Sequence, residues 1–447
     1  MTGMPVCKET LAPGMPVAVV GAGAAGLAAV RALSDRHPIL LFEPQSHLGG
    51  HANTFLVPDG PDEGLALDVG FMVFNPTNYP VLTRTFENLG VETQPAEMSF
   101  AFEDAHRNFA YALNFQNAGQ HAASHRIVKS ARALSPLLKP IIAFFEAGNK
   151  DLAIGIDPAL QLRSYLKRIG ASKALARDYV YPMGAAIWSC SIDKIGDYPA
   201  QALLSFFQNH GLLTFDDGPQ WLSVKGGSRT YVDTIGREAK NLKVVNEAVT
   251  RVGETRSGVM IETVSGRRFE AAGAVIATQA DQARALLEAP GEKLDGLLSA
   301  WEYTDNTAIL HTDPRAMPRD RDLWAGWNHL AHKASHQRRY SSAFSYYLNR
   351  LQSHDGTAND YFVTLNAQNL NEMIDPKRIL ARYAFRHPLY TAKSLATQKE
   401  LAENTWGRVR LCGNYFGHGF HEDAFRSGIQ AAESLIGLDN SIPQKHL

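Results

Sequence analysis

The sequence predicts an α/β fold in which a nucleotide-binding domain with a parallel, helix-covered sheet carries an inserted α+β domain. Three observations support this: a strand, glycine turn and helix near the start, a second such unit near the end, and strand-like segments between them. The chain has 447 residues, enough for two or three domains of about 150 residues each. Hydrophobic residues make up 45% of it, so it can bury a large core.

The first unit begins with an apolar segment, Pro16–Val20, which we expect to be a strand. A glycine turn follows it and opens a helix-like stretch that ends near Leu33. In dinucleotide-binding proteins the first glycine of such a turn makes the sharp bend, the second admits the pyrophosphate, and the third lets helix and strand pack closely. The free N–H groups of the helix then bind the phosphates. The predicted contacts are Gly21, Gly23, Ala25 and Gly26.

An acidic residue closes this unit. The segment His37–Glu43 is expected to be a second strand, and Glu43 follows Gly21 by 22 positions. A carboxylate there can accept hydrogen bonds from both ribose hydroxyls, which favours an adenosine ribose without a 2′-phosphate. The Rossmann-like order of strand, turn, helix, strand and acid therefore predicts an adenine dinucleotide.

A second glycine pair, close after Glu43, favours a flavin over a nicotinamide cofactor. A nicotinamide dehydrogenase usually continues into another crossover helix, whereas in flavoproteins a bare backbone passes beside the extended FAD. An ordinary surface turn is the alternative interpretation. The residues expected to contact FAD here are Gly49, Gly50, His51, Gly70, Phe71 and Met72.

Composition excludes several other classes. The formal net charge is -1 and the basic residues are dispersed, so no nucleic-acid partner is expected. The three cysteines lack CxxC spacing, which argues against a zinc site or a disulfide framework and favours a cytoplasmic protein. His329, His332 and His336 have helical spacing, but we expect a solvated helix face and no metal. Residues 1–14 are expected to be a loose leader without signal-peptide character. No apolar run reaches the roughly 20 residues that span a bilayer.

The middle of the chain begins with an amphipathic pattern over 125–145, which Pro136 and Pro140 are expected to interrupt. Its basic flank, Arg126 to Lys139, leaves two interpretations open: peripheral contact with a membrane surface, or a helical wall with solvated charges, which is favoured. Apolar residues at 203–207 and 212–213 are candidates for lining a tunnel.

Further strands are expected at 242–249, 259–264 and 273–278, and they return the chain to the FAD domain. Val249 is expected beside the adenine end, and Thr278 is a further predicted contact. Segments 307–311 and 361–366 look like strands of a second sheet. The predicted FAD domain therefore comprises 14–75, 215–285 and 400–440, and the substrate domain comprises 76–214 and 286–399.

A glycine-rich turn near the C-terminus is expected to close over the flavin. The strand at 409–412 leads into it, and a helix with an acidic first turn follows. The N–H groups of that helix can stabilise negative charge at N1 and O2 of a reduced flavin, and the small Ala424 and Gly428 allow close packing. The predicted contacts are Gly413, Asn414, His421, Glu422, Asp423 and Ala424.

At these residues the chain resembles the flavin-containing amine oxidase superfamily, with the two-domain architecture also known from glutathione reductase. It is most similar to a bacterial branch of predicted amine oxidases and NAD/FAD-binding proteins. The motifs that carry this resemblance are Tyr181–Ser189, Lys225–Tyr231, Tyr346–Gln352 and Gly419–Asp423. The resemblance implies FAD-dependent oxidoreductase activity, and that branch is associated with cyclopropane-type fatty-acid synthases and with modified acyl chains.

Two positions depart from the superfamily. Its amine oxidases often place a lysine near flavin N5, but the best matching strand, Asn306–His311, contains none. Asn414 stands where an acid is common. The missing lysine weakens the case for ordinary amine oxidation, whereas the Asn414 amide can still form a hydrogen bond to the cofactor.

The resemblance places four candidate catalytic residues near the flavin: His387, His421, Tyr415 and Trp188. His387 is expected in a turn, where it suits proton transfer near pH 7. Capping of backbone groups is the alternative role for His387, and helix capping is the alternative for His421 and Glu422.

Three functions follow from this sequence. The first is oxidation, dehydrogenation or isomerisation of an unsaturated or methylated acyl chain by hydride transfer to flavin N5. The second is an amine oxidase that releases peroxide. The third is an FAD-containing partner subunit that presents lipid to a methyltransferase.

Overall fold

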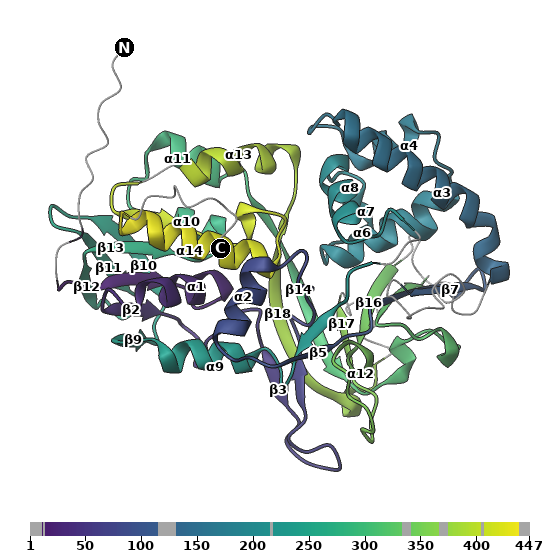
Figure 1. The fold of residues 1–447 in the computed structure, drawn as a ribbon, viewed down its shortest axis with the longest axis horizontal. Helices are drawn as coiled ribbons and strands as arrows, with labels where there is room; N and C mark the ends of the chain where they lie inside the picture. The colour runs from purple at the N-terminus through teal and green to yellow at the C-terminus, as the bar shows by residue number, and fades with distance from the viewer. Residues whose placement is uncertain are drawn as a thin grey trace.

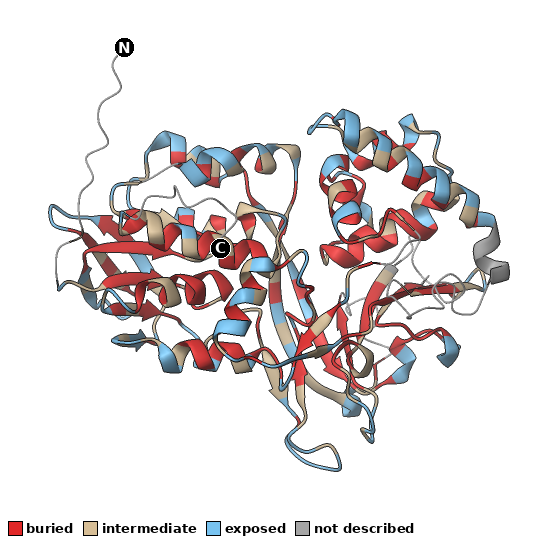
Figure 2. Ribbon diagram, viewed as in Figure 1, coloured by how far each residue is buried: buried red, intermediate tan, exposed pale blue. Residues whose placement is uncertain are grey.

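The computed structural model describes residue 11 and residues 14–114, 131–214, 218–332, 341–365, 374–403 and 406–437. Figure 1 shows two parts side by side: one in which helices cover a parallel sheet, and one with a large sheet beside a group of helices. The strands at the centre of both parts are mostly buried, and exposed residues concentrate on outer helix faces and loops (Figure 2).

A five-stranded parallel sheet joins both ends of the chain. The strands lie in the order β19-β13-β1-β2-β9, and each neighbouring pair is parallel. Their bounds are β1 Val17–Val20, β2 Ile39–Phe42, β9 Leu242–Val245, β13 Gly273–Ile276 and β19 Val409–Leu411. They are short and apolar, as parallel strands covered on both faces usually are. The predicted α/β fold class is confirmed.

Two helices from opposite ends of the chain pack together on this sheet. They are α1 (Ala24–Leu33) and α14 (His421–Leu435). Gly428 lies at their contact, where an added Cβ would stand 2.1 Å from the carbonyl oxygen of Ala25. The close packing that Gly428 predicted is therefore present.

The predicted strand over 242–249 is two strands. β9 ends at Val245, and β10 (Val249–Glu254) begins a separate antiparallel sheet with β11 (Val259–Thr263) and β12 (Arg268–Ala271). A tight turn divides them, because the N–H of Glu247 donates to the carbonyl of Val245 (2.9 Å). The side chain of Asn246 leaves the strand direction and donates to the carbonyl of Gln45 (3.1 Å).

A seven-stranded sheet forms the second part, in the order β18-β14-β17-β16-β15-β6-β7. The bounds are β6 Ser99–Asp104, β7 Phe109–Asn114, β14 Glu302–His311, β15 Trp327–His332, β16 Ser341–Tyr347, β17 Phe362–Leu365 and β18 Ile379–Leu389. The two strands predicted for a second sheet are confirmed as parts of β14 and β17. All seven strands come from the two segments predicted for the substrate domain, but the exact domain limits stay a prediction.

His387 lies in β18, opposite Thr304 of β14, so the predicted turn around it is wrong. Pro388 suggested that turn. β18 is an edge strand of the sheet, and a proline is tolerated there because its missing N–H is not needed for a hydrogen bond to a neighbouring strand.

The helical group contains a long helix that runs through two prolines. α3 spans Ala131–Ile154 without a break at Pro136 or Pro140, so the expected interruption is wrong. Pro136 is exposed and Pro140 is half-buried, so water can reach the carbonyls that each proline leaves without a donor. Ile141 and Phe145 are buried as the apolar pattern predicted, whereas residues 125–130 lie outside the described part.

The remaining helices cover these sheets. Those beside α3 are α4 Leu162–Arg168, α5 Lys173–Leu175, α6 Tyr181–Ile187, α7 Ile192–Ile195 and α8 Ala200–Asn209. The others are α2 Pro80–Asn88, α9 Arg229–Glu238, α10 Ala280–Leu286, α11 Gly291–Leu298, α12 Leu348–Leu351 and α13 Ala392–Glu403. Two small sheets pair β3 (Thr54–Leu56) with β4 (Ala66–Asp68) and β5 (Thr93–Pro95) with β8 (Leu222–Val224). None of the helices within the described ranges has the length and apolar character needed to cross a membrane.

Candidate functional site

The first glycine turn has the geometry of a phosphate-binding turn. Gly21 has φ +97°, and an added Cβ there would lie 2.9 Å from the carbonyl oxygen of Ala277. At Gly26 the Cβ would lie 1.9 Å from the carbonyl oxygen of Gly21. By contrast, Gly23 is partly exposed and nothing stands within 4 Å of its Cβ position. No side chain caps α1 at Gly23, so its first N–H groups are available to an anion.

Glu43 is held at the end of β2 by two backbone groups. Its Oε2 accepts from the N–H of Ala22 (3.0 Å) and its Oε1 from the N–H of Gln45 (3.1 Å). A carboxylate has about four acceptor positions, so both oxygens can still accept from a ribose. The bond from Asn246 to Gln45 brings the turn before Val249 to the same place. This arrangement fits the adenine end of a dinucleotide.

The second glycine pair lies against the first turn. The N–H of Gly49 donates to the carbonyl of Ala22 (2.8 Å), and an added Cβ on Gly50 would lie 3.1 Å from Gly23 Cα. At Gly70 a Cβ would lie 2.1 Å from the carbonyl oxygen of His51, yet Gly70 itself is exposed beside buried neighbours. The N–H of Phe71 also donates to His51 (3.0 Å). Accessible backbone of this kind fits an extended cofactor.

The C-terminal turn completes this arrangement. A Cβ on Gly413 would lie 3.6 Å from the carbonyl oxygen of Thr278, and one on Gly21 would lie 3.5 Å from Thr278 Cγ2. Thr278 therefore stands between the two terminal turns. Asn414 uses its Nδ2 to donate to the carbonyl of Gly419 (3.2 Å), which shapes the turn. The glycine turns, Glu43 and Thr278 thus lie next to one another, and the contact of the predicted residues with FAD stays a prediction.

The two acidic side chains in the first turn of α14 are hydrogen-bonded to backbone N–H groups. Glu422 accepts from the N–H groups of Val81 (3.1 Å) and Leu82 (3.0 Å) at the start of α2. Asp423 accepts from the N–H groups of His418 (2.8 Å) and Phe420 (3.1 Å). Both carboxylates therefore cap backbone, as the alternative interpretation of Glu422 proposed. Because both carboxylates are engaged in this way, we expect the backbone N–H groups of α14, rather than these acids, to lie near a flavin.

Three histidines from distant segments form a cluster. The rings of His51 and His387 lie 5.2 Å apart, and His421 stacks on Phe71 at 3.9 Å and 18°. Burial lowers the pKa of His51 to about 4. Burial and the neighbouring His51 lower the pKa of His387 and of His421 to about 3. All three are neutral at pH 7, which disfavours any of them as a strong base. The sequence identified each residue but not their proximity.

Asn306 lies beside this cluster, on strand β14. It is 4% exposed, and its Nδ2 lies 2.9 Å from His387 Nδ1. An uncharged amide therefore contacts His387.

An aromatic wall joins the helical group to the C-terminal turn. Trp188, at the end of α6, donates from Nε1 to the carbonyl of His418 (3.1 Å). Phe206 of α8 stacks on Phe420 at 4.9 Å and on His210 at 3.8 Å. The sequence predicted Trp188, and it placed Phe206 in a candidate tunnel segment and Phe420 in the C-terminal motif, but it did not predict their contact and it missed His210. Their aromatic character alone could not distinguish a site from core, because buried helices carry the same residues.

Tyr415 lies outside the histidine cluster. Its side chain is fully buried, and its ring contacts Trp301 at 5.6 Å and Phe416 at 4.7 Å. Burial raises the pKa of its hydroxyl well above the usual value. This position argues for a packing role in place of the predicted catalytic one.

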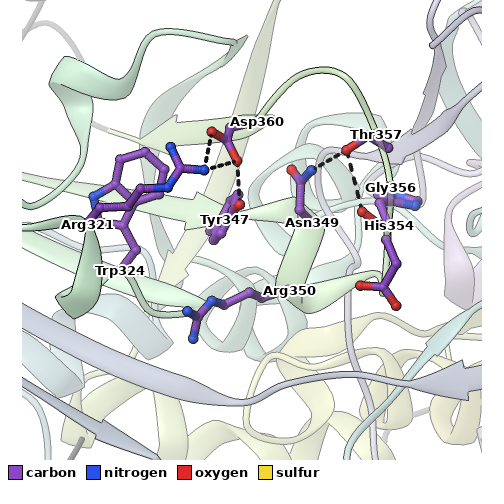
Figure 3. A pocket seen from close by; sticks show the side chains of 10 residues that line it. Arg321, Trp324, Tyr347, Asn349, Arg350, His354, Gly356, Thr357 and Asp360 are labelled. Atoms are coloured by element: carbon purple, nitrogen blue, oxygen red, sulfur yellow. Dashed lines mark hydrogen bonds and ion pairs between the residues drawn. The ribbon is translucent and has the colours of Figure 1, made fainter. Parts of the chain in front are cut away.

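Two other features lie apart from this site. A polar cavity of about 300 Å³ in the second part is lined by residues such as Arg321 and Tyr347, and Figure 3 shows both hydrogen-bonded to Asp360. None of the predicted site residues lines it.

His329 lies buried in β15, stacked on Phe102 at 5.2 Å, so the solvated helix predicted at this position is wrong. Within the described ranges no group of three or more metal-ligating side chains occurs, and His336 lies outside them.

Comparison with known proteins gives a family and several relatives. The family model described as flavin containing amine oxidoreductase matches residues 24–383. A Mycobacterium tuberculosis protein that carries the name of a flavin-containing monoamine oxidase, AofH, is 26% identical over 56% of this chain and 54% of its own length. An L-amino-acid oxidase of Siganus canaliculatus is 23% identical over 58% of this chain and 49% of its own. The chain thus spans about half the length of the curated relatives it matches.

Solved structures share the fold. Cyclohexylamine oxidase from Brevibacterium oxydans has a TM-score of 0.67 at 15% identity, covering 95% of this chain and 99% of its own. Putrescine oxidase bound to putrescine gives 0.65 at 14% identity, covering 95% and 99%. A fatty acid isomerase from P. acnes that produces CLA gives 0.65 at 11% identity, covering 94% and 98%. At these identities the likeness shows the fold, and it does not select a substrate.

Proposed function

Because the chain belongs to the flavin containing amine oxidoreductase family, whose members use FAD, we propose that it oxidises an unsaturated or methylated fatty acyl chain. The observation that carries this proposal is the neutral, aromatic character of the site. His51, His387 and His421 are uncharged at pH 7, and Asn306, which contacts His387, is an uncharged amide. The nearby carboxylates are committed to backbone N–H groups. Such a site suits an apolar substrate better than an ammonium ion.

The chemistry that FAD supplies when bound is acceptance of a hydride from a substrate carbon, and an external oxidant such as O₂ later removes the two electrons. The chain contributes binding, orientation and exclusion of water. Trp188, Phe206 and Phe420 provide an apolar wall, and with FAD bound the first N–H groups of α14 would stabilise the negative charge of the reduced flavin. The neutral histidines donate or accept hydrogen bonds at its edge.

The test uses the purified, FAD-loaded protein under anaerobic conditions. Free unsaturated fatty acids, phospholipids with unsaturated chains and phospholipids with cyclopropane chains are added separately, and the absorbance of oxidised flavin is followed. Loss of that absorbance, together with a new acyl product by mass spectrometry, supports the proposal. Unchanged lipid and unbleached flavin in every arm contradict it.

An amine oxidase that releases peroxide is the second candidate, favoured by the names of the matched oxidases. A panel of primary and secondary amines, including putrescine and cyclohexylamine, separates the two functions. Peroxide release with an amine, without any change in lipid, establishes this alternative over the first.

A partner-subunit role makes a different prediction. A protein that only presents lipid to a methyltransferase binds FAD and lipid but reduces no flavin by itself. Co-purification with such a transferase, combined with absence of turnover, supports that role. Peripheral membrane contact is part of the same proposal, and flotation with phospholipid vesicles tests it.

A further inference from the structure

Asn306 and His387 form a pair across strands β14 and β18. The Asn306 Nδ2 lies 2.9 Å from His387 Nδ1 and 3.4 Å from the carbonyl oxygen of Thr304. A carbonyl oxygen only accepts hydrogen bonds, so the Asn306 atom that faces it is the amide nitrogen and not the amide oxygen. The orientation of the Asn306 amide is therefore fixed by the backbone of its own strand.

This orientation fixes the tautomer of His387. An amide NH₂ group only donates, so His387 Nδ1 accepts with its lone pair. In a neutral imidazole the single proton then resides on Nε2. Burial keeps the ring neutral at pH 7, since it lowers the pKa of His387 to about 3.

The Nε2–H group of His387 has no partner within this pair, because Asn306 contacts Nδ1. Across the described ranges, the structure gives Nε2 no hydrogen-bond partner, and the residue is partly exposed beside the ring of His51 at 5.2 Å. A neutral imidazole with a lowered pKa can polarise an oxygen atom by donating a hydrogen bond without losing its proton, as in triosephosphate isomerase. His387 is thus arranged as a hydrogen-bond donor, whereas the sequence indicated a residue that donates or accepts a proton near pH 7.

We propose that Asn306 is a positioning residue that holds His387 as a hydrogen-bond donor, and that His387 Nε2–H binds a carbonyl or carboxylate oxygen of the substrate. This inference rests on the proposed function only in placing His387 beside the substrate. It deepens that function, because a fatty acid or acyl ester carries such an oxygen. An ammonium group carries only donors and finds no acceptor at this nitrogen.

The test compares two ligands that share one chain, octanoate and octylamine, on the FAD-loaded protein. NMR of protein labelled with ¹⁵N-histidine reports the tautomer, and His387→Gln assigns the His387 signal. We expect a proton on Nε2 in the wild type. Octanoate should shift that signal and perturb the flavin spectrum, whereas octylamine should do neither.

Asn306→Asp reverses the hydrogen bond, because a carboxylate accepts from Nδ1–H and leaves Nε2 as an acceptor. We expect the proton to move to Nδ1 and octanoate affinity to fall about tenfold or more. Asn328→Asp is the matched control: Asn328 is another buried asparagine of the same sheet, bonded to the backbone carbonyls of Ala325 and Ser345. That change should leave octanoate affinity unaltered.

The outcomes separate this inference from the proposed function. A proton on Nδ1 in the wild type overturns the inference without any variant, as does octanoate binding that survives Asn306→Asp. If octanoate shifts His387 while no lipid reduces the flavin, the inference stands and the proposed function fails. If lipids reduce the flavin and octanoate leaves His387 unshifted, the function stands and the inference fails.

Discussion

Gly428 of α14 rests directly on the carbonyl oxygen of Ala25 in α1, so the two ends of the chain meet where no side chain fits. A Cβ on Gly428 would lie 2.1 Å from that oxygen and 3.0 Å from the Cβ of Ala28. Because α1 and α14 both begin at the predicted FAD site, their separation sets its width. We therefore expect FAD binding to depend on the close packing of Gly428 against α1.

Gly428→Ala should push α14 away from α1. We expect the free energy of unfolding to fall by about 1–3 kcal/mol, as for other overpacked core positions, and FAD occupancy to fall with it. Urea unfolding and the ratio of flavin to protein absorbance measure the two effects. Gly296→Ala, in helix α11 with nothing near its Cβ position, is the control and should stabilise the protein slightly. Full stability and full FAD content in Gly428→Ala would contradict this account.

Glu43→Gln should weaken FAD binding without unfolding the protein. The amide keeps the shape of the carboxylate, but it replaces one charged acceptor with a donor, and hydrogen bonds to a charged group are each worth about 1.5–3 kcal/mol. We expect the Kd for FAD to rise at least about tenfold, measured by flavin fluorescence on apoprotein. The exposed Glu63→Gln serves as control. An unchanged Kd in Glu43→Gln would place the adenosine ribose elsewhere.

The parts of the site that the sequence predicted are those that local chemistry dictates. The positive φ of Gly21 and the contact of Gly26 with the Gly21 carbonyl are internal to one turn, and Glu43 is defined by its distance from that turn. The proximity of His51, His387 and His421 depends on how three distant segments pack. No spacing in the sequence records such packing, so the cluster became visible only in the structure.

The wrong expectations have the same origin. Pro388 indicates a turn by itself, but as part of an edge strand it is harmless. Pro140 indicates a helix break, but α3 is long and its proline side is not fully buried. Tyr415 sits in the predicted turn, yet its ring points into the core beside Trp301. In each case tertiary context decided against the local signal.

Stability should fall as the solution is acidified below neutral pH, with His387 as one cause. Its pKa is lowered from 6.5 to about 3 in the folded protein. Between those values the unfolded chain binds a proton that the folded protein does not, so unfolding takes up protons and becomes easier as pH falls. His387→Gln should lower the slope by up to about 1.4 kcal/mol per pH unit, measured by urea unfolding.

Asp68 contributes to the same titration with the opposite sign. Burial raises the pKa of Asp68 to about 6, so its contribution to stability is present at acid pH and lost as pH rises through that value. The comparison of wild type with His387→Gln cancels this contribution, because Asp68 is the same in both. Parallel pH curves for the two proteins would show that the pKa of His387 is not lowered in the folded protein.

Trp188→Phe should weaken the link between the helical group and the C-terminal turn. It removes the hydrogen bond from Nε1 to the carbonyl of His418 (3.1 Å) while it keeps an aromatic ring against Phe206. We expect a loss of about 1 kcal/mol in stability and, in addition, a higher KM for the substrate that reduces the flavin. The control is Trp301→Phe, which also removes a tryptophan hydrogen bond, here a buried one to Thr397 Oγ1 (3.0 Å) outside this wall. Both variants should lose similar stability, but only Trp188→Phe should raise KM. If KM rises in both variants or in neither, Trp188 does not lie beside the substrate.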